Sequence, residues 1–249
     1  MPYNETPAQM RRSLDQARAE GLDKICREAE RKAGIALGLL LAIASRETHC
    51  RNVVGDGGHG RGYFQIDDRS HQAFLRRHGV LGAGGIPPVR EAALYAAQIV
   101  ADNVRSARQG RVRDKDVLHV ALAGYNAGPG NALKCYREGD CDSKTAHGNY
   151  GRDVLDRLEI VLDWLDGRPS KPERPALREG SRGPAVLELK RKLAAWYTTD
   201  PPFAMTPVFG AGTTKAVRAF QEAHRLGVDG EVGPNTWKAL GRIRVKAPA

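Results

Sequence analysis

The stretch IALGLLLAIASRE, residues 35–47, carries the strongest signal about the architecture of this chain. It is apolar on every side until Ser45, and a helix that is apolar all round belongs in the middle of a domain. Glu47 ends this stretch, and a polar, glycine-rich segment from Gly55 to Gly62 follows, which favours turns or a small hairpin. We therefore expect a buried central helix that carries a carboxyl group at its end.

Helical patterns surround this central segment. Residues 8–32 carry apolar side chains at helical spacing, with a break expected near Gly21. Similar patterns predict helices over residues 68–78, 89–109, 114–124 and 151–165. The sequence therefore predicts a mostly α domain with a small β part.

A second domain is expected near the carboxyl end. Residues 166–175, DGRPSKPERP, contain three prolines and several charges, which is typical of a linker. The predicted boundaries are a domain over 1–166, a linker over 167–176 and a domain over 177–249. In the last of these, Gly-Pro pairs at 183–184 and 233–234 each open a helix, and a third helix is expected over 212–224. The apolar residues of this three-helix module are spaced as a core: Val186, Leu189, Leu193, Val217, Phe220 and Leu240.

Composition and charge narrow the class of protein. The 249 residues are 41% hydrophobic and 27% charged, with a net charge of +10, which is typical of an ordinary globular protein. Residues 173–249 hold 13 lysines and arginines against 7 acidic residues. Such a basic surface attracts polyanions such as nucleic acid, anionic lipid or a bacterial wall, or serves solubility alone. We expect no membrane-spanning segment and no secretory signal in the first 25 residues.

The four cysteines match no common zinc-ligand spacing. A bridge between Cys135 and Cys141 is sterically plausible, and Cys26 and Cys50 could join two helices. We favour free thiols, since no leader directs the chain to an oxidising compartment. The pattern Gly55-x-Gly57-x-x-Gly60 fits a dinucleotide fingerprint, but no alternation of strand and helix surrounds it, so nucleotide binding is not expected.

Glu47 is the candidate catalytic residue that the pattern itself suggests. A carboxyl group held against apolar walls stays protonated nearer to neutral pH. A protonated carboxyl group is the general acid that cleavage of a glycosidic bond requires. The alternative is a solvent-facing glutamate at a helix end.

Four blocks, in chain order, resemble the goose-type lysozymes. They are SRETH at 45–49, GDGGHGRGYFQID at 55–67, AGYNAG at 123–128 and GNYGRDV at 148–154. The third block is also similar to the Tyr-Asn-Ala-Gly motif of lytic transglycosylases. The resemblance covers residues 1–167 and implies a lysozyme-like α fold with a small β part.

This resemblance implies roles for three carboxyl groups. Glu47 matches the general acid that protonates the oxygen leaving between N-acetylmuramic acid and N-acetylglucosamine. Asp56 and Asp67 match two acidic residues that hold or activate water on the opposite face of the sugar, as in an inverting glycosidase. We favour Asp67 as the base, because an aspartate in a glycine-rich turn such as Asp56 often bonds to its own backbone. A structural role for Asp56 stays open.

Further residues match the sugar-binding cleft of that family. Tyr125, Asn126 and Tyr150 match cleft positions, and Gln65 is expected to support the cleft wall. Aromatic rings and amides suit sugars, because they offer a flat apolar face and paired hydrogen bonds. For Tyr125 the alternative is a core residue at a helix end. We expect neither a metal nor a cofactor.

Residues 177–249 are similar to the peptidoglycan-binding three-helix domain. The match is carried by Gly183-Pro184, Phe220-Gln221, Asp229-Gly230 and Thr236-Trp237. It implies binding to the bacterial wall, with Arg182 and Trp237 as candidate contact residues.

These patterns together predict an endolysin-type muramidase, a lysozyme that hydrolyses the β-1,4 bond between N-acetylmuramic acid and N-acetylglucosamine. A cutting domain followed by a binding domain, without a leader, resembles an antimicrobial bacteriophage endolysin. Such a protein collects in the host cytoplasm until it is released to the wall. We expect a monomer whose partner is peptidoglycan, with no nucleic acid and no stable membrane insertion.

Two alternatives remain. A lytic transglycosylase would leave 1,6-anhydromuramic acid ends, and such enzymes usually need no water-activating aspartate such as Asp67. A non-catalytic wall-binding protein would not need Glu47 and both aspartates.

Overall fold

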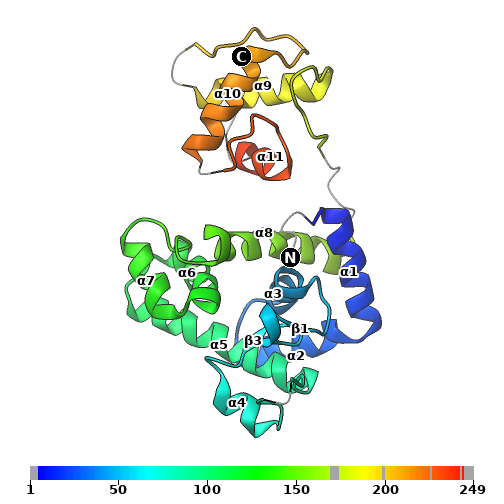
Figure 1. Cartoon of the computed structure of the whole chain (residues 1–249), viewed down its shortest axis with the longest axis vertical. Coiled ribbons are helices and arrows are strands. Elements are labelled where there is room, and N and C mark those ends of the chain that lie inside the picture. Colours follow the sequence, from blue (N-terminus) through cyan, green and yellow to red (C-terminus); the bar gives the residue numbers. More distant parts are fainter. Residues whose placement is uncertain are drawn as a thin grey trace. The chain divides into compact units, whose positions relative to one another are not determined.

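The computed structural model describes residues 5–82, 84–168, 174–197, 200–224, 226–241 and 243. The chain divides into two compact units, residues 1–170 and 171–249, and Figure 1 shows the helices of each. The predicted linker, 167–176, includes residues 169–173, which lie outside the described residues. The mostly α fold expected from the sequence is confirmed, with eleven α-helices and one small sheet in the described part of the chain.

The first unit begins with two helices separated where the sequence predicts a break. α1 (Pro7–Ala19) starts with a capping box in which Thr6 and Gln9 exchange hydrogen bonds. α2 (Leu22–Ala33) follows Gly21, whose φ of 79° lies in the left-handed region that glycine adopts without strain.

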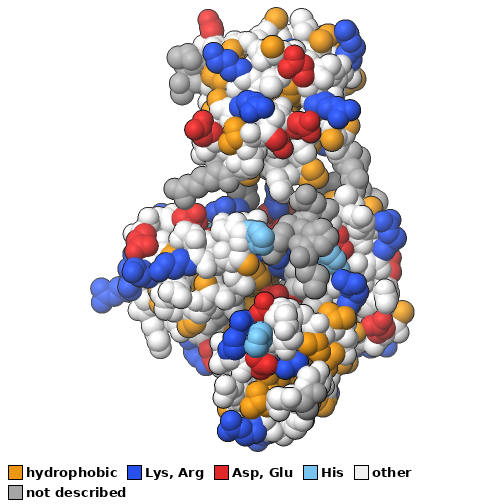
Figure 2. Space-filling view, in the orientation of Figure 1, with side chains coloured by type: hydrophobic (Ala, Val, Ile, Leu, Met, Phe, Trp, Pro, Cys, Tyr) orange, Lys and Arg blue, Asp and Glu red, His pale blue; other side chains and the backbone are white. Residues whose placement is uncertain are grey.

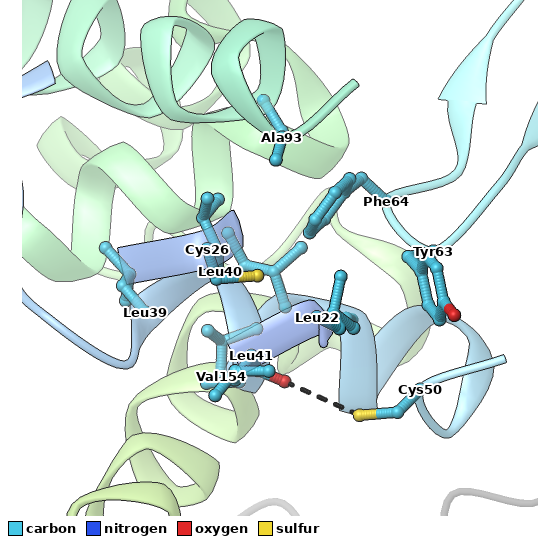
Figure 3. Close-up of a cluster of buried hydrophobic side chains, with 14 of the residues drawn as sticks. Leu22, Cys26, Leu39, Leu40, Leu41, Cys50, Tyr63, Phe64, Ala93 and Val154 are labelled. Carbon is cyan, nitrogen blue, oxygen red and sulfur yellow. Dashed lines mark hydrogen bonds between the residues drawn. The ribbon is translucent and has the colours of Figure 1, made fainter. Parts of the chain in front are cut away.

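The buried helix α3 (Leu39–Thr48) is the centre of the first unit and packs against α1, α2, α5 and α8. Figure 3 shows part of this core, where Leu40 and Leu41 meet Leu22 and Cys26 from α2. The helix begins four residues later than predicted. Its first turn is capped by the buried carboxylate of Glu30, which accepts hydrogen bonds from the backbone N–H of Gly38 at 3.0 Å and of Leu40 at 2.7 Å. A negative charge at this end is favourable, because helix N-termini carry unpaired N–H groups.

The glycine-rich segment after α3 forms a three-stranded antiparallel sheet. β1 (Val54–Gly55) pairs with β2 (Gly60–Arg61), and β2 pairs with β3 (Ile66–Asp67). The 3-10 turn η1 (Asp56–Gly58) joins the first two strands. The hairpin expected from the sequence is therefore present. Gly55 and Gly60 lie in antiparallel strands and Gly57 in the 3-10 turn between them, not at a strand-to-helix turn that could hold a dinucleotide.

The remaining helices of the first unit are α4 (Gln72–Arg77), α5 (Val89–Gln109), α6 (Asp114–Ala127), α7 (Pro129–Arg137) and α8 (Tyr150–Leu165), with the 3-10 turn η2 (Ala146–Gly148) before the last. Of these helices, α5 and α8 pack against α3, whereas α7 packs against α5 and α6. The prediction for α5 is confirmed at both ends. The expected helix over 68–78 is shorter, and α7 was not predicted, because Gly128, Pro129 and Gly130 have the composition of a join. Pro129 instead occupies the first helical position, where its missing N–H costs nothing.

The second unit has three helices: α9 (Pro184–Trp196), α10 (Ala211–Ala223) and α11 (Pro234–Gly241). Each predicted Gly-Pro turn opens a helix, as expected. All six predicted core residues are fully buried. Isolated antiparallel bridges pair Leu177 with Val232 and Arg182 with Val208, which ties the segments that precede the three helices to one another.

All four cysteines are free and buried, in agreement with the preference for thiols. Burial raises the pKa of Cys50 and Cys141 to about 12, so these thiols are poor nucleophiles near neutral pH. Within the described residues, none of the helices combines the length and the apolar character that a bilayer span requires.

Candidate active site

A cleft of about 860 Å³ opens in the first unit beside the end of α3. The sheet, the segment before α4, and helices α5 and α6 provide its walls. Of the residues singled out from the sequence, Glu47, Asp56, Gln65, Asp67, Tyr125 and Asn126 line it. The structure therefore brings together six of the seven side chains proposed for catalysis or sugar binding, although they lie up to 79 positions apart in the chain.

Glu47 is held at the cleft by the way α3 ends. The helix stops because His49 and Cys50 both adopt left-handed conformations, with φ of 53° and 55°. The carboxyl group of Glu47 is largely enclosed, and this desolvation raises its pKa to about 7. The nearby charge of Asp56 acts in the same direction, whereas the hydrogen bond from Tyr150 and the charge of Arg46 oppose it. Glu47 can thus hold a proton close to neutral pH.

Tyr150 is a buried residue that bonds to the carboxyl group of Glu47. It is only 1% exposed, and its hydroxyl donates to Oε1 of Glu47 at 2.5 Å. Arg46 lies over the ring of Tyr150 at 5.2 Å and pairs with Asp153 at 2.8 Å. Tyr150 is not among the residues that line the cleft. The structure therefore places this predicted cleft residue behind Glu47, where its hydroxyl bonds to that carboxyl group and does not line the cleft.

Asp56 and Asp67 face the cleft from two places in the sheet and share one cation. Asp56 lies in η1 and its side chain is 61% exposed, whereas Asp67 lies in β3 and is 27% exposed. Both carboxylates pair with Nη2 of Arg69. The hydrogen bonds from Arg69 are the main reason that the pKa of Asp67 is lowered below its usual value, so Asp67 is ionised at neutral pH.

The side chain of Gln65 stabilises the small sheet next to these aspartates. Its amide nitrogen donates to the backbone oxygens of Val53 at 3.1 Å and Gly62 at 2.8 Å. Its amide oxygen lies so close to Gly55 and Gly60 that a Cβ on either would stand 2.2 Å from it. Close packing therefore favours glycine at both positions, and Gln65 both holds this backbone and lines the cleft.

Tyr125 and Asn126 occupy the end of α6. The Tyr125 hydroxyl donates to the backbone oxygen of Phe64 at 2.9 Å, and its ring is parallel to that of Tyr150 with centroids 6.4 Å apart. The side-chain oxygen of Asn126 accepts from the backbone N–H of Ala146 at 2.7 Å. Tyr125 thus holds the turn between β2 and β3 in place, and it also borders the cleft.

Several cleft residues were missed by the sequence reasoning. Arg69, Ser70 and His71 follow Asp67 closely, and their proximity to that residue in the chain was the available signal. The ring nitrogen Nδ1 of His71 lies 3.0 Å from the Tyr95 hydroxyl. The other missed residues come from α5 and carried no local signal: Ile99, Asp102 and Asn103.

One group of possible metal ligands, His119, Cys141 and Asp142, occurs in the part of the chain that the structure describes. It lies outside the cleft. The Asp142 carboxylate already accepts hydrogen bonds from His119 at 2.7 Å and from the backbone N–H of Gly151 and Arg152 at 2.7 and 3.0 Å. These bonds cap the first turn of α8, so this cluster is accounted for by the fold.

The two candidate wall contacts of the second unit, Arg182 and Trp237, differ in their exposure. Arg182 is exposed. Trp237 is only 4% exposed, packs in the core and donates from Nε1 to the backbone oxygen of Pro175 at 2.8 Å. The suggestion that Trp237 contacts the wall therefore disagrees with its buried position. Figure 2 shows basic side chains mixed with acidic ones on the visible face of this unit, and they do not form one continuous patch.

Comparisons with known proteins agree with both resemblances. Residues 182–240 match the peptidoglycan binding domain family. The chain is 28% identical over 127 residues to lysozyme g from Struthio camelus, a match that covers 49% of this chain and 56% of that protein. It is also 37% identical over 68 residues to zinc D-Ala-D-Ala carboxypeptidase from Streptomyces albus G, which covers 27% of each.

The chain thus carries a peptidoglycan-binding domain at residues 182–240 and is homologous to goose-type lysozyme over about half its length. It spans between a quarter and just over half of the length of these curated relatives.

Proposed function

We propose that this protein is a muramidase that hydrolyses the β-1,4 bond between N-acetylmuramic acid and N-acetylglucosamine in bacterial peptidoglycan. The observation that carries the proposal is Glu47, an enclosed carboxyl group with a pKa raised to about 7, which lines a cleft together with two aspartates. A cleft of this volume has room for sugar residues. The homology to lysozyme g and the peptidoglycan-binding domain support a substrate in the bacterial wall.

In the proposed reaction, protonated Glu47 donates its proton to the glycosidic oxygen as the bond from that oxygen to C1 of muramic acid breaks. A water molecule attacks C1 from the opposite face and loses a proton to an aspartate. Asp67 and Asp56 are the two candidates for that base or for holding the water. Tyr150 orients Glu47, and Gln65 and Tyr125 keep the cleft walls in position.

The aspartates distinguish this reaction from that of a lytic transglycosylase. In the transglycosylase reaction the 6-hydroxyl of muramic acid attacks C1, so no water needs to be activated. The cleft places two carboxylates and Arg69 in one cluster on its wall, an arrangement that a transglycosylase would not need. Hydrolysis is therefore the first candidate.

The deciding experiment is mass spectrometry of fragments released from purified peptidoglycan, before and after borohydride treatment. Hydrolysis leaves muramic acid ends that borohydride reduces. Fragments lighter by one water and resistant to borohydride would instead establish a transglycosylase. Absence of any released fragment would favour a non-catalytic wall-binding protein.

We further propose that the protein acts as a bacteriophage endolysin. The second unit would hold the enzyme on the wall and Arg182 would contribute to the contact. In this role the protein would be a monomer that collects in the host cytoplasm and reaches the wall when the membrane is opened by another protein. Lysis of living cells from outside and from within, compared in one host, tests this proposal.

A further inference from the structure

The cleft contains a cation that the mechanism above does not use. Arg69 follows β3, is 58% exposed at its side chain and lines the cleft together with Glu47 and the two aspartates. Its guanidinium group is the point at which the two carboxylates meet.

The contacts of Arg69 with the two aspartates are unequal. Nε lies 3.0 Å from each carboxylate oxygen of Asp67, Nη2 also pairs with that group, and the backbone N–H of Arg69 donates to Oδ1 of Asp67 at 2.7 Å. Asp56 is reached through Oδ2, which lies 2.5 Å from Nη2. Arg69 therefore bonds to both carboxylate oxygens of Asp67 but to one carboxylate oxygen of Asp56.

These contacts also limit the separation of the carboxylates. One oxygen of each lies within 2.5 Å of the same nitrogen, so those two oxygens are no farther apart than twice that distance. Two carboxylates this close repel each other, so without a cation the pKa of at least one of them would rise. A planar guanidinium group can satisfy two carboxylates at once, which an ammonium group does less well.

Other titratable groups face this cluster from the neighbouring elements. Glu47 lies at the end of α3, and its pKa is raised in part by the charge of Asp56. His59, between η1 and β2, lowers the pKa of Asp67, whereas the charge of Asp67 acts to raise the pKa of His71, ahead of α4. None of these groups bridges the two carboxylates. Arg69 is the side chain that joins them, while the sheet and η1 position their backbones.

We propose that Arg69 is a positioning residue that holds Asp56 and Asp67 together as a pair of ionised carboxylates on the water side of the cleft. This inference rests on the proposed hydrolytic function for its consequence in catalysis. The pairing itself is independent of that function. With both carboxylates ionised, one can anchor the cluster while the other accepts the proton of the attacking water.

The test compares Arg69→Gln, Arg69→Lys and wild type by two measurements. The first is a carboxyl NMR titration of Asp56 and Asp67, assigned with Asp→Asn variants. In Arg69→Gln we expect at least one of the two carboxyls to titrate about one pH unit or more above its wild-type value. Arg69→Lys keeps the charge and should reverse part of this change.

The second measurement is the pH profile of kcat and of KM on soluble peptidoglycan fragments. Loss of Arg69 should move the acidic limb of the kcat profile upward by the same amount as the carboxyl titration. At pH values below both titration midpoints, each pH unit by which this limb moves should lower kcat about tenfold, whereas kcat at pH 7 should change little. KM should change less, because the sugar contacts remain.

Arg113→Gln is the matched control, since Arg113 forms an exposed ion pair with Asp116 at 2.7 Å outside the cleft. It should leave both measurements as in wild type. Wild-type titration curves in Arg69→Gln, or the same changes in Arg113→Gln, would overturn the proposal. If the wild-type protein proves not to cleave glycan, the proposed function fails, and the titration still decides the pairing of the carboxylates.

Discussion

At the level of single residues, the pKa values of two carboxyl groups in the cleft are shifted in opposite directions. Desolvation raises the pKa of Glu47 to about 7, whereas hydrogen bonds from Arg69 lower that of Asp67. Environments that push the pKa values of neighbouring acids apart are typical of acid and base roles in one active site. Glu47 is therefore suited to give a proton and Asp67 to remain charged.

Glu47→Gln should abolish lysis, because an amide cannot donate the proton. We expect a loss of about a hundredfold or more in kcat on purified peptidoglycan. The thermal stability of Glu47→Gln relative to wild type is the control, because it shows whether the variant is still folded. Since the folded pKa of Glu47 exceeds the ordinary value of 4.5, the folded state binds the proton that the unfolded state has lost between about pH 4.5 and 7. Stability therefore falls as the pH rises through that window.

Glutamine does not ionise, so Glu47→Gln avoids the loss of stability that ionisation of Glu47 causes in wild type at high pH. The variant should therefore melt at a higher temperature than wild type at pH 8, with a smaller difference at pH 4. Thermal unfolding followed by circular dichroism at both pH values measures this. Substantial lysis by a well-folded Glu47→Gln variant would remove Glu47 from the role of acid.

Tyr150→Phe tests the support of the acid. The Tyr150 hydroxyl donates to the Glu47 carboxylate and thereby lowers its pKa. Removing that hydroxyl should raise the pKa of Glu47, so the alkaline limb of the kcat/KM profile should move to higher pH. Tyr125→Phe is the matched control, because its hydroxyl bonds to the Phe64 backbone and not to Glu47. An alkaline limb that stays in place in Tyr150→Phe would contradict this role.

Among the secondary-structure elements, the small sheet packs closely around one side chain, that of Gln65, whose amide group lies against β1 and β2. The amide oxygen of Gln65 occupies the space that a Cβ at Gly55 or Gly60 would need. The sheet then sets the positions of Asp56 and Asp67, which lie just after β1 and within β3. Packing inside the sheet and the geometry of the acidic cluster are therefore coupled.

Gly60→Ala should destabilise the first unit by roughly 1–3 kcal/mol, the usual cost of overpacking. Adding Gln65→Ala should recover part of this loss, because the clashing amide is then removed. A double-mutant cycle by urea unfolding measures the coupling. Gly130→Ala is the control, since a Cβ there meets nothing within 4 Å and the residue lies in α7. Additive effects of the two changes would show that the close approach does not limit the sheet.

In the molecule as a whole, the proposed glycan cleavage and the peptidoglycan-binding domain belong to different compact units. Each unit has its own hydrophobic core, one built around α3 and the other on α9, α10 and α11. The peptidoglycan-binding domain falls within the second unit. The two activities should therefore be separable.

A chain ending at residue 170 should keep cleavage of soluble glycan fragments and lose most of its sedimentation with purified walls. The loss should be larger at low salt, where the +6 charge of residues 173–249 is least screened. Sedimentation assays at two salt concentrations, with the isolated residues 171–249 as the complementary piece, measure this. Undiminished wall binding by the shortened chain would show that the first unit holds the wall unaided.

Local sequence patterns were sufficient to predict the architecture and to single out Glu47, and the family resemblance supplied five further residues that line the cleft. Periodic apolar residues identify α3 and α5 because helix formation and burial follow local spacing. The same reasoning missed α7, since its opening residues Gly128 to Gly130 have the composition of a loop. It also suggested that Trp237 contacts the wall, because composition does not tell a buried tryptophan from an exposed one.

How the cleft residues act on one another became apparent from the folded chain alone. Tyr150 lies 103 positions from Glu47, yet its hydroxyl reaches the carboxylate. Arg69 joins two aspartates that the sequence presents as independent candidates. Desolvation and charge pairing depend on distances in space between segments that are remote in the chain. For that reason the local pattern could nominate Glu47 and the family resemblance the two aspartates, whereas the packing of α3, α8 and the sheet decides which partners these carboxyl groups meet.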